Sequence, residues 1–250
     1  MSRRRRRPHW FRHLLGVSRQ YRELVAMLPE IRTLGVNLRK QFPKEVVDEL
    51  AIPSYTHSNP LMRHLFWQRL AVALEWVDSL GSPIGAVLDF GSGLGILTPP
   101  LQRRSVRVIG CDIHPEVTLA GAKQLGATAT EVIDARVGIG QLPDRSIGAV
   151  LALDVLEHIE DVTSLAGEFA RVLSPGGKLL CSLPTENALY RLGRRLAGFS
   201  GGYHLHQPAR IVAAVAQAFR LRRVARLYPG MPLFDFYEGE VVSGAAVERP

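Results

Sequence analysis

The sequence predicts an α/β protein built on a doubly wound, mostly parallel sheet with an antiparallel last strand and helices on both faces. Apolar runs rich in Val and Ile recur through the middle of the chain, and amphipathic segments with helical spacing separate most of them. Strands that are apolar throughout are typical of a parallel sheet covered on both faces. At 250 residues the chain is long enough to bury such a core, so a Rossmann-like architecture is expected.

Residues 1–58 predict a basic N-terminal extension with short helices. Residues 1–45 hold twelve Arg or Lys against three Glu, whereas the whole chain has a formal net charge of +8. The remainder is therefore close to neutral. Apolar positions at helical spacing follow the basic leader, prolines interrupt them, and residues 51–58 are expected to form a loop.

A long helix is predicted next, at the start of a main domain that spans residues 59–245. Asn59 and Pro60 supply an N-cap and a first-turn proline, and Gly81 and Pro83 end the helix. Its apolar stripe consists of Phe66, Leu70, Ala73, Leu74, Val77 and Leu80.

Strands and helices then alternate. Pro99 and Pro100 fall where a helix should follow the first strand, so this helix is expected to be short or kinked. Further helices are expected over 115–125, 161–173 and about 209–219. The predicted strands are 86–90, 106–113, 130–135, 147–154, 178–184, 221–228 and 233–242.

The stretch VLDFGSGLGIL, residues 87–97, places Gly91, Gly93 and Gly95 directly after the first strand. A glycine turn there lies at the carboxyl end of a parallel sheet, where a ligand binds and where glycine lets it approach the backbone. The spacing differs from the dinucleotide fingerprint G-x-G-x-x-G, and Asp89 would repel a pyrophosphate but suits a cationic ligand. A nicotinamide oxidoreductase is therefore disfavoured.

Acids at the ends of the next two strands complete a pattern. VIGCDIHP places Asp112 about twenty residues past the glycine loop, and VIDA places Asp134 at the end of the third strand. Together with SIGAVLALDVLEHIED and FARVLSPGGKLLCSLPTEN, this order over roughly residues 60–185 resembles that of class I S-adenosylmethionine-dependent methyltransferases. The resemblance implies S-adenosylmethionine as cofactor, bound by the glycine loop after Asp89.

The resemblance also implies roles for individual residues. Asp112 would bind the ribose hydroxyls and Ile113 would lie against the adenine. Asp134 would take the adenine amino group, beside the backbone of Ala135.

Methyl transfer needs a base only where the acceptor must lose a proton, and His158 is the candidate for that role. The alternative is that His158 is a purely structural histidine in a turn. Residues 185–208 depart from the alternation and predict a lid or substrate insertion, with Tyr190, Arg191, Arg194, Arg195, Phe199, Tyr203, His204 and His206. No Cys or acid cluster supports a metal site at these histidines, so no metal is expected.

Two functions from different classes remain open. The first is a methyltransferase acting on a small-molecule or lipid- or glycan-linked acceptor. The second is a non-catalytic binding module that keeps the pocket and uses the basic leader to engage a membrane surface, nucleic acid or a protein. The run Arg3–Arg7 suits an anionic membrane surface, or else is a solvated terminus. Nucleic acid is disfavoured, because no aromatic-interleaved basic stripe follows the leader.

The remaining composition concerns the compartment. Cys111 and Cys181 both fall in apolar strands, so they are expected to be reduced core residues of a cytoplasmic protein. No apolar run is long enough to span a membrane, and the basic start lacks the features of a signal peptide.

Overall fold

The computed structural model describes residues 18–50, 52–81, 84–104, 106–185, 206–228 and 232–242. The arginine run and nearly all of the predicted 185–208 insertion, including Tyr190, Tyr203 and His204, lie outside the described residues.

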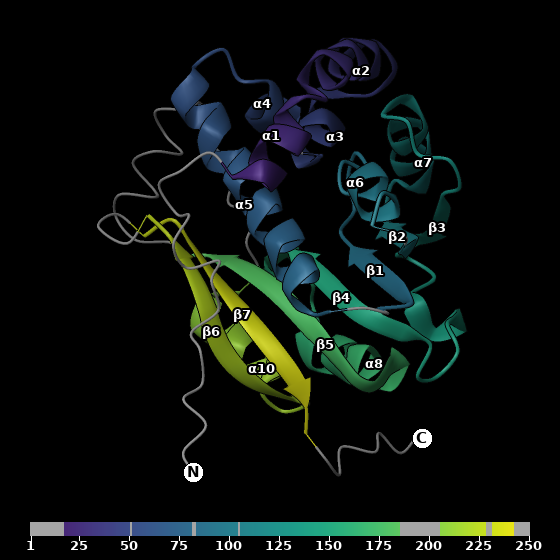
Figure 1. The fold of residues 1–250 in the computed structure, drawn as a ribbon, viewed down its shortest axis with the longest axis vertical. Coiled ribbons are helices and arrows are strands. Elements are labelled where there is room, and N and C mark those ends of the chain that lie inside the picture. The colour runs from purple at the N-terminus through teal and green to yellow at the C-terminus, as the bar shows by residue number, and fades with distance from the viewer. Residues whose placement is uncertain are drawn as a thin grey trace.

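Seven strands form one sheet in the order β3-β2-β1-β4-β5-β7-β6 (Figure 1). The pairs β1–β2, β1–β4, β2–β3 and β4–β5 are parallel, and β7 runs antiparallel to both β5 and β6. The predicted mostly parallel sheet with an antiparallel last strand is confirmed. The strands are β1 (Ala86–Phe90), β2 (Arg107–Asp112), β3 (Glu131–Asp134), β4 (Ile147–Leu153), β5 (Leu173–Pro184), β6 (Phe219–Leu227) and β7 (Phe234–Val241).

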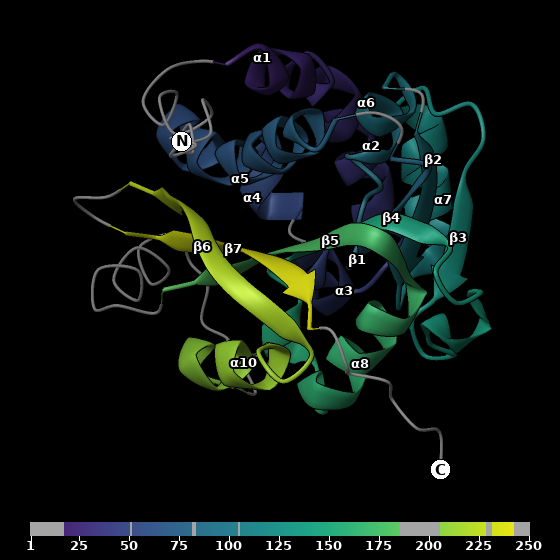
Figure 2. The ribbon, with the colours of Figure 1, turned by 60° about the horizontal axis from the view of Figure 1, so that its bottom comes forward.

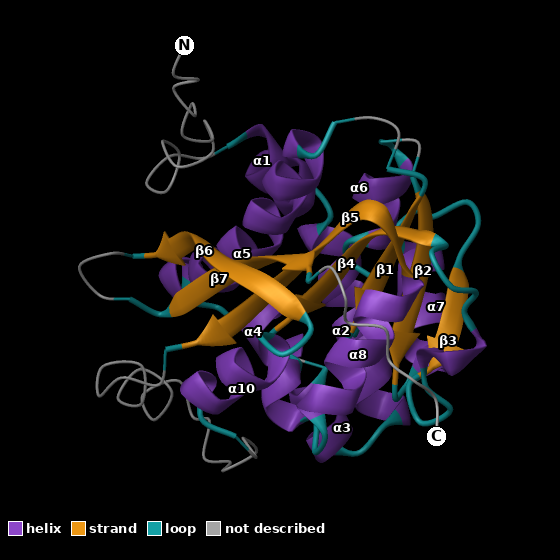
Figure 3. Ribbon diagram, turned by 90° about the horizontal axis from the view of Figure 1, so that it is seen from below, coloured by secondary structure: helices purple, strands orange, loops and turns teal. Residues whose placement is uncertain are grey.

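Helices cover both faces of the sheet, as Figures 2 and 3 show. Helices α8 (Val162–Val172) and α10 (Pro208–Val215) pack on one face. The other face carries the N-terminal helices and the helices that follow β1 and β2. These are α1 (Arg19–Val25), α2 (Leu28–Gln41), α3 (Lys44–Glu49), α4 (Ile52–Thr56), α5 (Pro60–Ser79), α6 (Thr98–Gln102) and α7 (Pro115–Gln124). Single 3-10 turns, η2 (Ile139–Gln141) and η3 (Leu156–His158), flank β4.

The central strands feed both layers because successive side chains point to opposite faces. Val87 of β1 belongs to the core beneath α5, and Leu88 belongs to the core beneath α8. Cys111 and Cys181 are buried free thiols within these strands, as expected.

Several element boundaries differ from the expectations. Strand β5 begins at Leu173 rather than at residue 178, and β6 begins at Phe219 rather than at residue 221. Residues 51–58 were expected to form a loop, but Ile52–Thr56 form helix α4. This helix is only five residues long and contains Pro53 at its second position, so it gives almost no periodic signal. The last helix ends at Val215 rather than near Phe219, because Phe219 already pairs with Val241 in the sheet. The expected short helix after the glycine loop is confirmed as α6, in which both prolines lie near the start.

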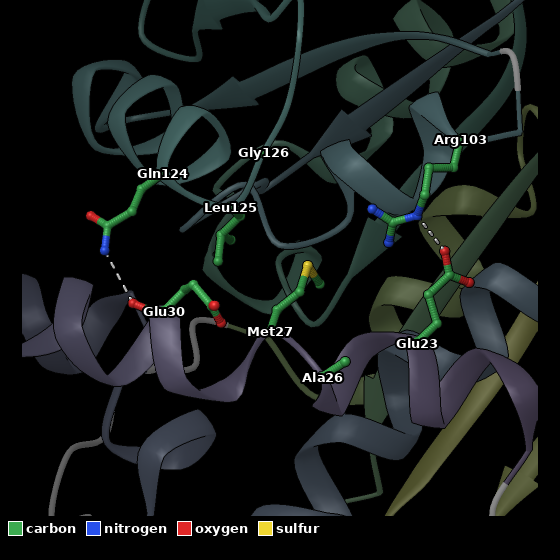
Figure 4. A pocket seen from close by; sticks show the side chains of 8 residues that line it. All are labelled: Glu23, Ala26, Met27, Glu30, Arg103, Gln124, Leu125 and Gly126. Atoms are coloured by element: carbon green, nitrogen blue, oxygen red, sulfur yellow. Dashed lines mark hydrogen bonds and ion pairs between the residues drawn. The ribbon is translucent and has the colours of Figure 1, made fainter.

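The N-terminal helices share the main hydrophobic core rather than standing apart from it. Leu24, Ile31 and Ile52 are fully buried in the same cluster as Trp67 of α5. The seam between these helices and the sheet domain shows as a shallow hollow at the α1–α2 turn (Figure 4). Ion pairs and hydrogen bonds cross this seam, from Arg103 Nε to Glu23 Oε1 (2.9 Å) and from Gln124 Nε2 to the Glu30 carbonyl (3.2 Å).

The exit of β5 is tied to the entry of β7. The Thr185 amide donates to the carbonyl of Leu233 (3.0 Å), and the Thr185 hydroxyl donates to the carbonyl of Pro232 (2.5 Å). The Leu233 amide donates in turn to the carbonyl of Leu227 at the end of β6 (3.2 Å). The segment after β5 begins, at Thr185, hydrogen-bonded to the residues that lead into β7, although the two are almost fifty residues apart in the sequence.

Gly148 in β4 allows the chain before β1 to approach the sheet closely. A Cβ at position 148 would lie 1.7 Å from the carbonyl oxygen of Ile84, a backbone atom that no side-chain rotation moves. We expect Gly148→Ala to lower the free energy of unfolding by about 2 kcal/mol or more, in the range of overpacked cores, as measured by urea denaturation. Gly140→Ala is the matched control, since its Cβ would meet only the Glu168 carboxylate at 3.9 Å. Equal stability of the two variants would contradict this packing role.

Candidate functional site

The predicted binding residues lie together at the carboxyl ends of the parallel strands. The chain passes from β1 to β2 and β3 on one side and then crosses to β4 and β5 on the other, so β1 and β4 flank the point where the strand order reverses. Open α/β sheets bind ligands outside the carboxyl ends of the strands at such a point. Asp89 lies in β1 beside its carboxyl end, and Asp112 and Asp134 end β2 and β3.

The glycine loop combines close packing with an open backbone. Gly91 has φ +78°, and a Cβ there would lie 2.7 Å from the Cβ of Val155. Gly93 has φ +50°, and among the described residues a Cβ on it would meet nothing within 4 Å. At Gly95 a Cβ would lie 2.8 Å from the carbonyl oxygen of Thr118. Gly91 and Gly95 are therefore required by their neighbours, whereas Gly93 leaves room for a ligand.

Four amides of this loop are engaged within the protein. The amides of Gly91 and Ser92 donate to the Cys111 carbonyl (2.8 and 3.2 Å), and the Gly95 amide donates to the Ser92 carbonyl (2.8 Å). The Gly93 amide donates to Asp112 Oδ2 (2.7 Å). The loop is thus fixed to the end of β2 before any ligand binds.

Asp112 lies at the centre of the site. Its carboxylate is buried, accepts from Gly93 through Oδ2, and accepts from the His114 amide through Oδ1 (3.0 Å). Each carboxylate oxygen has a second lone pair, so both oxygens retain the capacity to accept from ligand hydroxyls. The next residue, Ile113, is 39% exposed and presents apolar surface beside the carboxylate.

Asp89 is a buried acid next to Asp112. It is 3% exposed, and burial together with the negative charge of Asp112 raises the pKa of Asp89 to about 7. A carboxyl whose ionisation is this unfavourable gains most from a cationic partner, which would stabilise its charged form.

Asp134 is already paired with a neighbour in the sequence. Arg136 donates to both of its oxygens, from Nε to Oδ1 (2.9 Å) and from Nη2 to Oδ2 (2.8 Å), and this pair lowers the pKa of Asp134. The amide of Ala135 donates to the Asp112 carbonyl (2.9 Å) and is therefore used by the sheet. A ligand group at Asp134 would have to share this carboxylate with Arg136.

A polar cluster holds the exit of β4, the strand that pairs with β1 on the side away from β2. Asp154 has φ +50°, a conformation that few residues other than glycine adopt and that concentrates at functional sites. Arg69 of α5 donates from Nη1 to Asp154 Oδ2, and the Ser182 hydroxyl donates to Asp154 Oδ1 (2.9 Å). Arg69 Nη2 also donates to the Tyr55 hydroxyl (3.4 Å), and burial raises the pKa of Tyr55. Tyr55 therefore stays protonated at neutral pH.

His158 is exposed at the end of η3, directly after Glu157, which is 3% exposed. The backbone amide of His158 donates to the Val155 carbonyl (3.0 Å). The imidazole thus has access to solvent near the exit of β4, and its role as a base stays a prediction. His206 has its Nε2 3.0 Å from the Glu160 carbonyl oxygen.

Tyr55, Arg69 and Asp154 were not among the predicted site residues. Arg69 did leave a signal, since it is a charge next to Leu70 in a helix whose second half is almost wholly buried. Asp154 also left one, because it ends an apolar strand in the same way as Asp112. Tyr55 left none, because its place depends on how α4 packs onto α5.

Comparison with known proteins agrees with this geometry. Residues 88–181 match a family described as methyltransferase domain. A ubiquinone biosynthesis O-methyltransferase from Xanthomonas oryzae pv. oryzae (strain PXO99A) is 34% identical over 116 residues, which are 44% of this chain and 48% of the relative. A protein of the same name from Bradyrhizobium sp. (strain ORS 278) is 36% identical over 104 residues, 40% of each chain. The chain spans about half the length or less of these curated relatives.

Solved structures share the fold. Magnesium protoporphyrin IX methyltransferase from Synechocystis PCC 6803, crystallised with bound SAH, matches with a TM-score of 0.59 and 20% identity over 82% of this chain and 98% of that one. A SAM-dependent methyltransferase from Archaeoglobus fulgidus matches with a TM-score of 0.55 and 14% identity over 70% and 93% of the two chains. These likenesses show the architecture of the sheet and its helices.

No group of three or more His, Cys, Asp or Glu side chains in the described part of the chain is placed to hold a metal ion. Among the helices with described residues, none is both long and apolar enough to cross a membrane.

The raised pKa of Asp89 predicts a pH-dependent stability. Between its ordinary value near 3.8 and about 7, the folded protein holds a proton that the unfolded chain releases, so stability falls as the pH rises through this window. We expect Asp89→Asn, which mimics the protonated acid, to be more stable than the unmodified protein at pH 8 by a few kcal/mol, on the order of 1.4 kcal/mol per pKa unit. The difference should vanish near pH 4.

Urea denaturation from pH 4 to pH 8, without ligand, measures this difference. Glu160→Gln removes an exposed carboxylate and serves as the control, with no comparable gain expected. A constant difference between Asp89→Asn and the unmodified protein across the pH range would contradict the assignment.

Proposed function

We propose that this chain, whose residues 88–181 form a class I methyltransferase domain, transfers a methyl group from S-adenosylmethionine to a small-molecule or lipid- or glycan-linked acceptor. The observation that carries the proposal is the joining of the open Gly93 backbone to the Asp112 carboxylate by one hydrogen bond of 2.7 Å. This pair lies at the carboxyl end of the sheet, beside the point where the strand order reverses.

The residues present fit the cofactor. Gly93 leaves open space beside its backbone, which a ligand can fill, and a side chain there would be strained at φ +50°. Asp112 retains lone pairs for the two ribose hydroxyls, and Ile113 offers exposed apolar surface for the adenine. Asp89 has a charged form that a cationic amino-acid end would stabilise.

The adenine side of the site involves Asp134. Its carboxylate would accept from the adenine amino group while Arg136 keeps part of its present hydrogen bonding. Because this ion pair is partly exposed, its rearrangement should cost little.

The cofactor supplies an activated methyl group on a sulfonium, whose C–S electron pair leaves with the sulfur. The protein's part is to hold the acceptor in line with that group and to exclude other geometries. A hydroxyl acceptor must also lose its proton, and we assign His158, near the exit of β4, as the base that accepts it.

The acceptor is proposed from the comparisons and the charge pattern. The curated relatives are named as O-methyltransferases of ubiquinone biosynthesis, which favours a hydroxyl as the methylated group here. An amphiphilic, lipid- or glycan-linked acceptor would agree with the arginines of the 185–208 segment and with the run Arg3–Arg7.

The alternative is a non-catalytic module that binds the cofactor without turnover. Calorimetric titration with S-adenosylhomocysteine beside NADH decides the cofactor class, and transfer of labelled methyl from S-adenosylmethionine to hydroxylated acceptors decides turnover. Saturable binding of S-adenosylhomocysteine without any transfer would favour the module.

Asp112→Ala should weaken S-adenosylhomocysteine binding roughly tenfold or more, because charge-assisted hydrogen bonds to the ribose are lost. Calorimetry measures the affinity, and a melting curve checks the fold, since the variant also frees the Gly93 amide. Glu160→Gln is the control, with unchanged affinity expected. Full affinity in folded Asp112→Ala protein would remove Asp112 from the site.

Deletion of residues 2–7 should leave the affinity for S-adenosylhomocysteine unchanged while it reduces binding to vesicles that contain anionic lipid. The five arginines provide most of the charge of the leader, and such electrostatic binding falls with ionic strength. Co-sedimentation with vesicles at low and high salt measures the effect. Equal sedimentation of both forms would make the leader a passive tail.

A further inference from the structure

The glycine loop leaves one ligand group to be explained. The amino-acid end of the proposed cofactor carries an ammonium and a carboxylate on one carbon. Asp89 suits the ammonium, whereas the amides of Gly91, Ser92, Gly93 and Gly95 already donate within the protein. The ligand carboxylate therefore needs a hydrogen-bond donor other than these four amides.

Tyr55 of α4 carries a hydroxyl that could serve as this donor. Its hydroxyl accepts from Arg69 Nη2 (3.4 Å), and Arg69 pairs with Asp154 directly after β4, so the hydroxyl lies near the exit of this strand. The negative charges of Asp154 and Asp89 both act on the hydroxyl and raise the pKa of Tyr55 further. Trp67 holds the residue in place, because its Nε1 donates to the Tyr55 carbonyl (3.1 Å) and the two rings pack edge to face with centroids 5.8 Å apart.

Arg69 sets the direction of the Tyr55 hydroxyl. The guanidinium lies over the rings of Phe66 and Phe234, 4.8 and 4.9 Å from their centroids, and is paired with Asp154. It donates to the Tyr55 oxygen (3.4 Å), so the phenol proton is left to be donated elsewhere. The positive charge behind the oxygen makes that proton a better donor, because linked hydrogen bonds polarise one another.

We propose that the Tyr55 hydroxyl donates a hydrogen bond to the carboxylate of the cofactor's amino-acid end, with Arg69 as its positioning residue. Asp89 and Tyr55 then receive the two charged groups of one zwitterion side by side. The neighbouring carboxylates do not oppose this arrangement, since Arg69 pairs with Asp154 and the ligand ammonium pairs with Asp89. The inference rests on the proposed function, because it presumes that S-adenosylmethionine binds here.

Tyr55→Phe tests the proposal, because it removes only the hydroxyl and keeps the ring contact with Trp67. Calorimetry with two ligands separates the carboxylate from the rest of the cofactor. S-adenosylhomocysteine carries the amino-acid group, and 5′-methylthioadenosine shares the adenosine and thioether but ends in a methyl group. We expect Tyr55→Phe to bind S-adenosylhomocysteine roughly tenfold more weakly, as for a lost hydrogen bond to a charged group, and to bind 5′-methylthioadenosine within twofold of the unmodified protein.

Tyr21→Phe is the matched control. Tyr21 lies in α1, with its ring 4.8 Å from that of His64, and neither ligand should lose affinity. If Tyr55→Phe does not fold, Tyr55→Gln and Tyr55→Ala take its place. Tyr55→Gln keeps an N–H donor, so it should lose less affinity for S-adenosylhomocysteine than Tyr55→Ala does, whereas the two variants should bind 5′-methylthioadenosine equally.

The outcomes separate the two proposals. Equal losses for both ligands would make Tyr55 a structural residue, and no loss for either would remove it from the site; both results overturn the inference and leave the proposed function standing. An unmodified protein that binds neither ligand would overturn the proposed function itself, and the inference with it.

Discussion

The parallel pairing of β1 with both β2 and β4 is the constraint on which the rest of the structure depends. The glycine loop therefore lies where β1 ends, next to the ends of β2 and β4. From β1 the sheet continues through β2 to β3 on one side and through β4 and β5 to β6 on the other. Because both faces of this strand are buried, each face must be covered, and the N-terminal helices cover one of them together with α5. The fold and the site therefore follow from one strand and its two neighbours.

Electrostatics at this edge follow from the same arrangement. Asp89 lies one residue before the end of β1 and Asp112 ends the neighbouring β2, so these two acids share one buried region. Their partners differ, since Asp112 accepts two backbone amides while burial and Asp112 itself raise the pKa of Asp89. Backbone hydrogen bonds thus orient Asp112 before a ligand binds, whereas the ionised form of Asp89 would be stabilised by a bound cation.

The sequence was informative wherever the signal was local. The strands, the glycine turn and the acids at strand ends could be predicted, because continuous apolar runs, and the glycines and acids that follow them, are local features of the sequence. The short helix after the glycine loop could be predicted too, since two prolines limit it. Helix α4 could not, because five residues carry no period, and neither could Tyr55, whose place depends on packing between helices. The pairing of Asp134 with Arg136 also went unseen, because it is a choice among side-chain conformations.

The hydrogen bonds of Thr185 link parts of the chain that meet at the carboxyl end of the sheet. They join the exit of β5 to the entry of β7, and Leu233 extends the connection to the end of β6. Any displacement of Thr185 would therefore pull on the β6–β7 hairpin. Phe234, at the start of β7, packs against the Arg69 guanidinium, so such a movement would reach the exit of β4 through one ring. Thr185, the β6–β7 hairpin and Arg69 are therefore linked mechanically through one continuous set of contacts at the carboxyl end of the sheet.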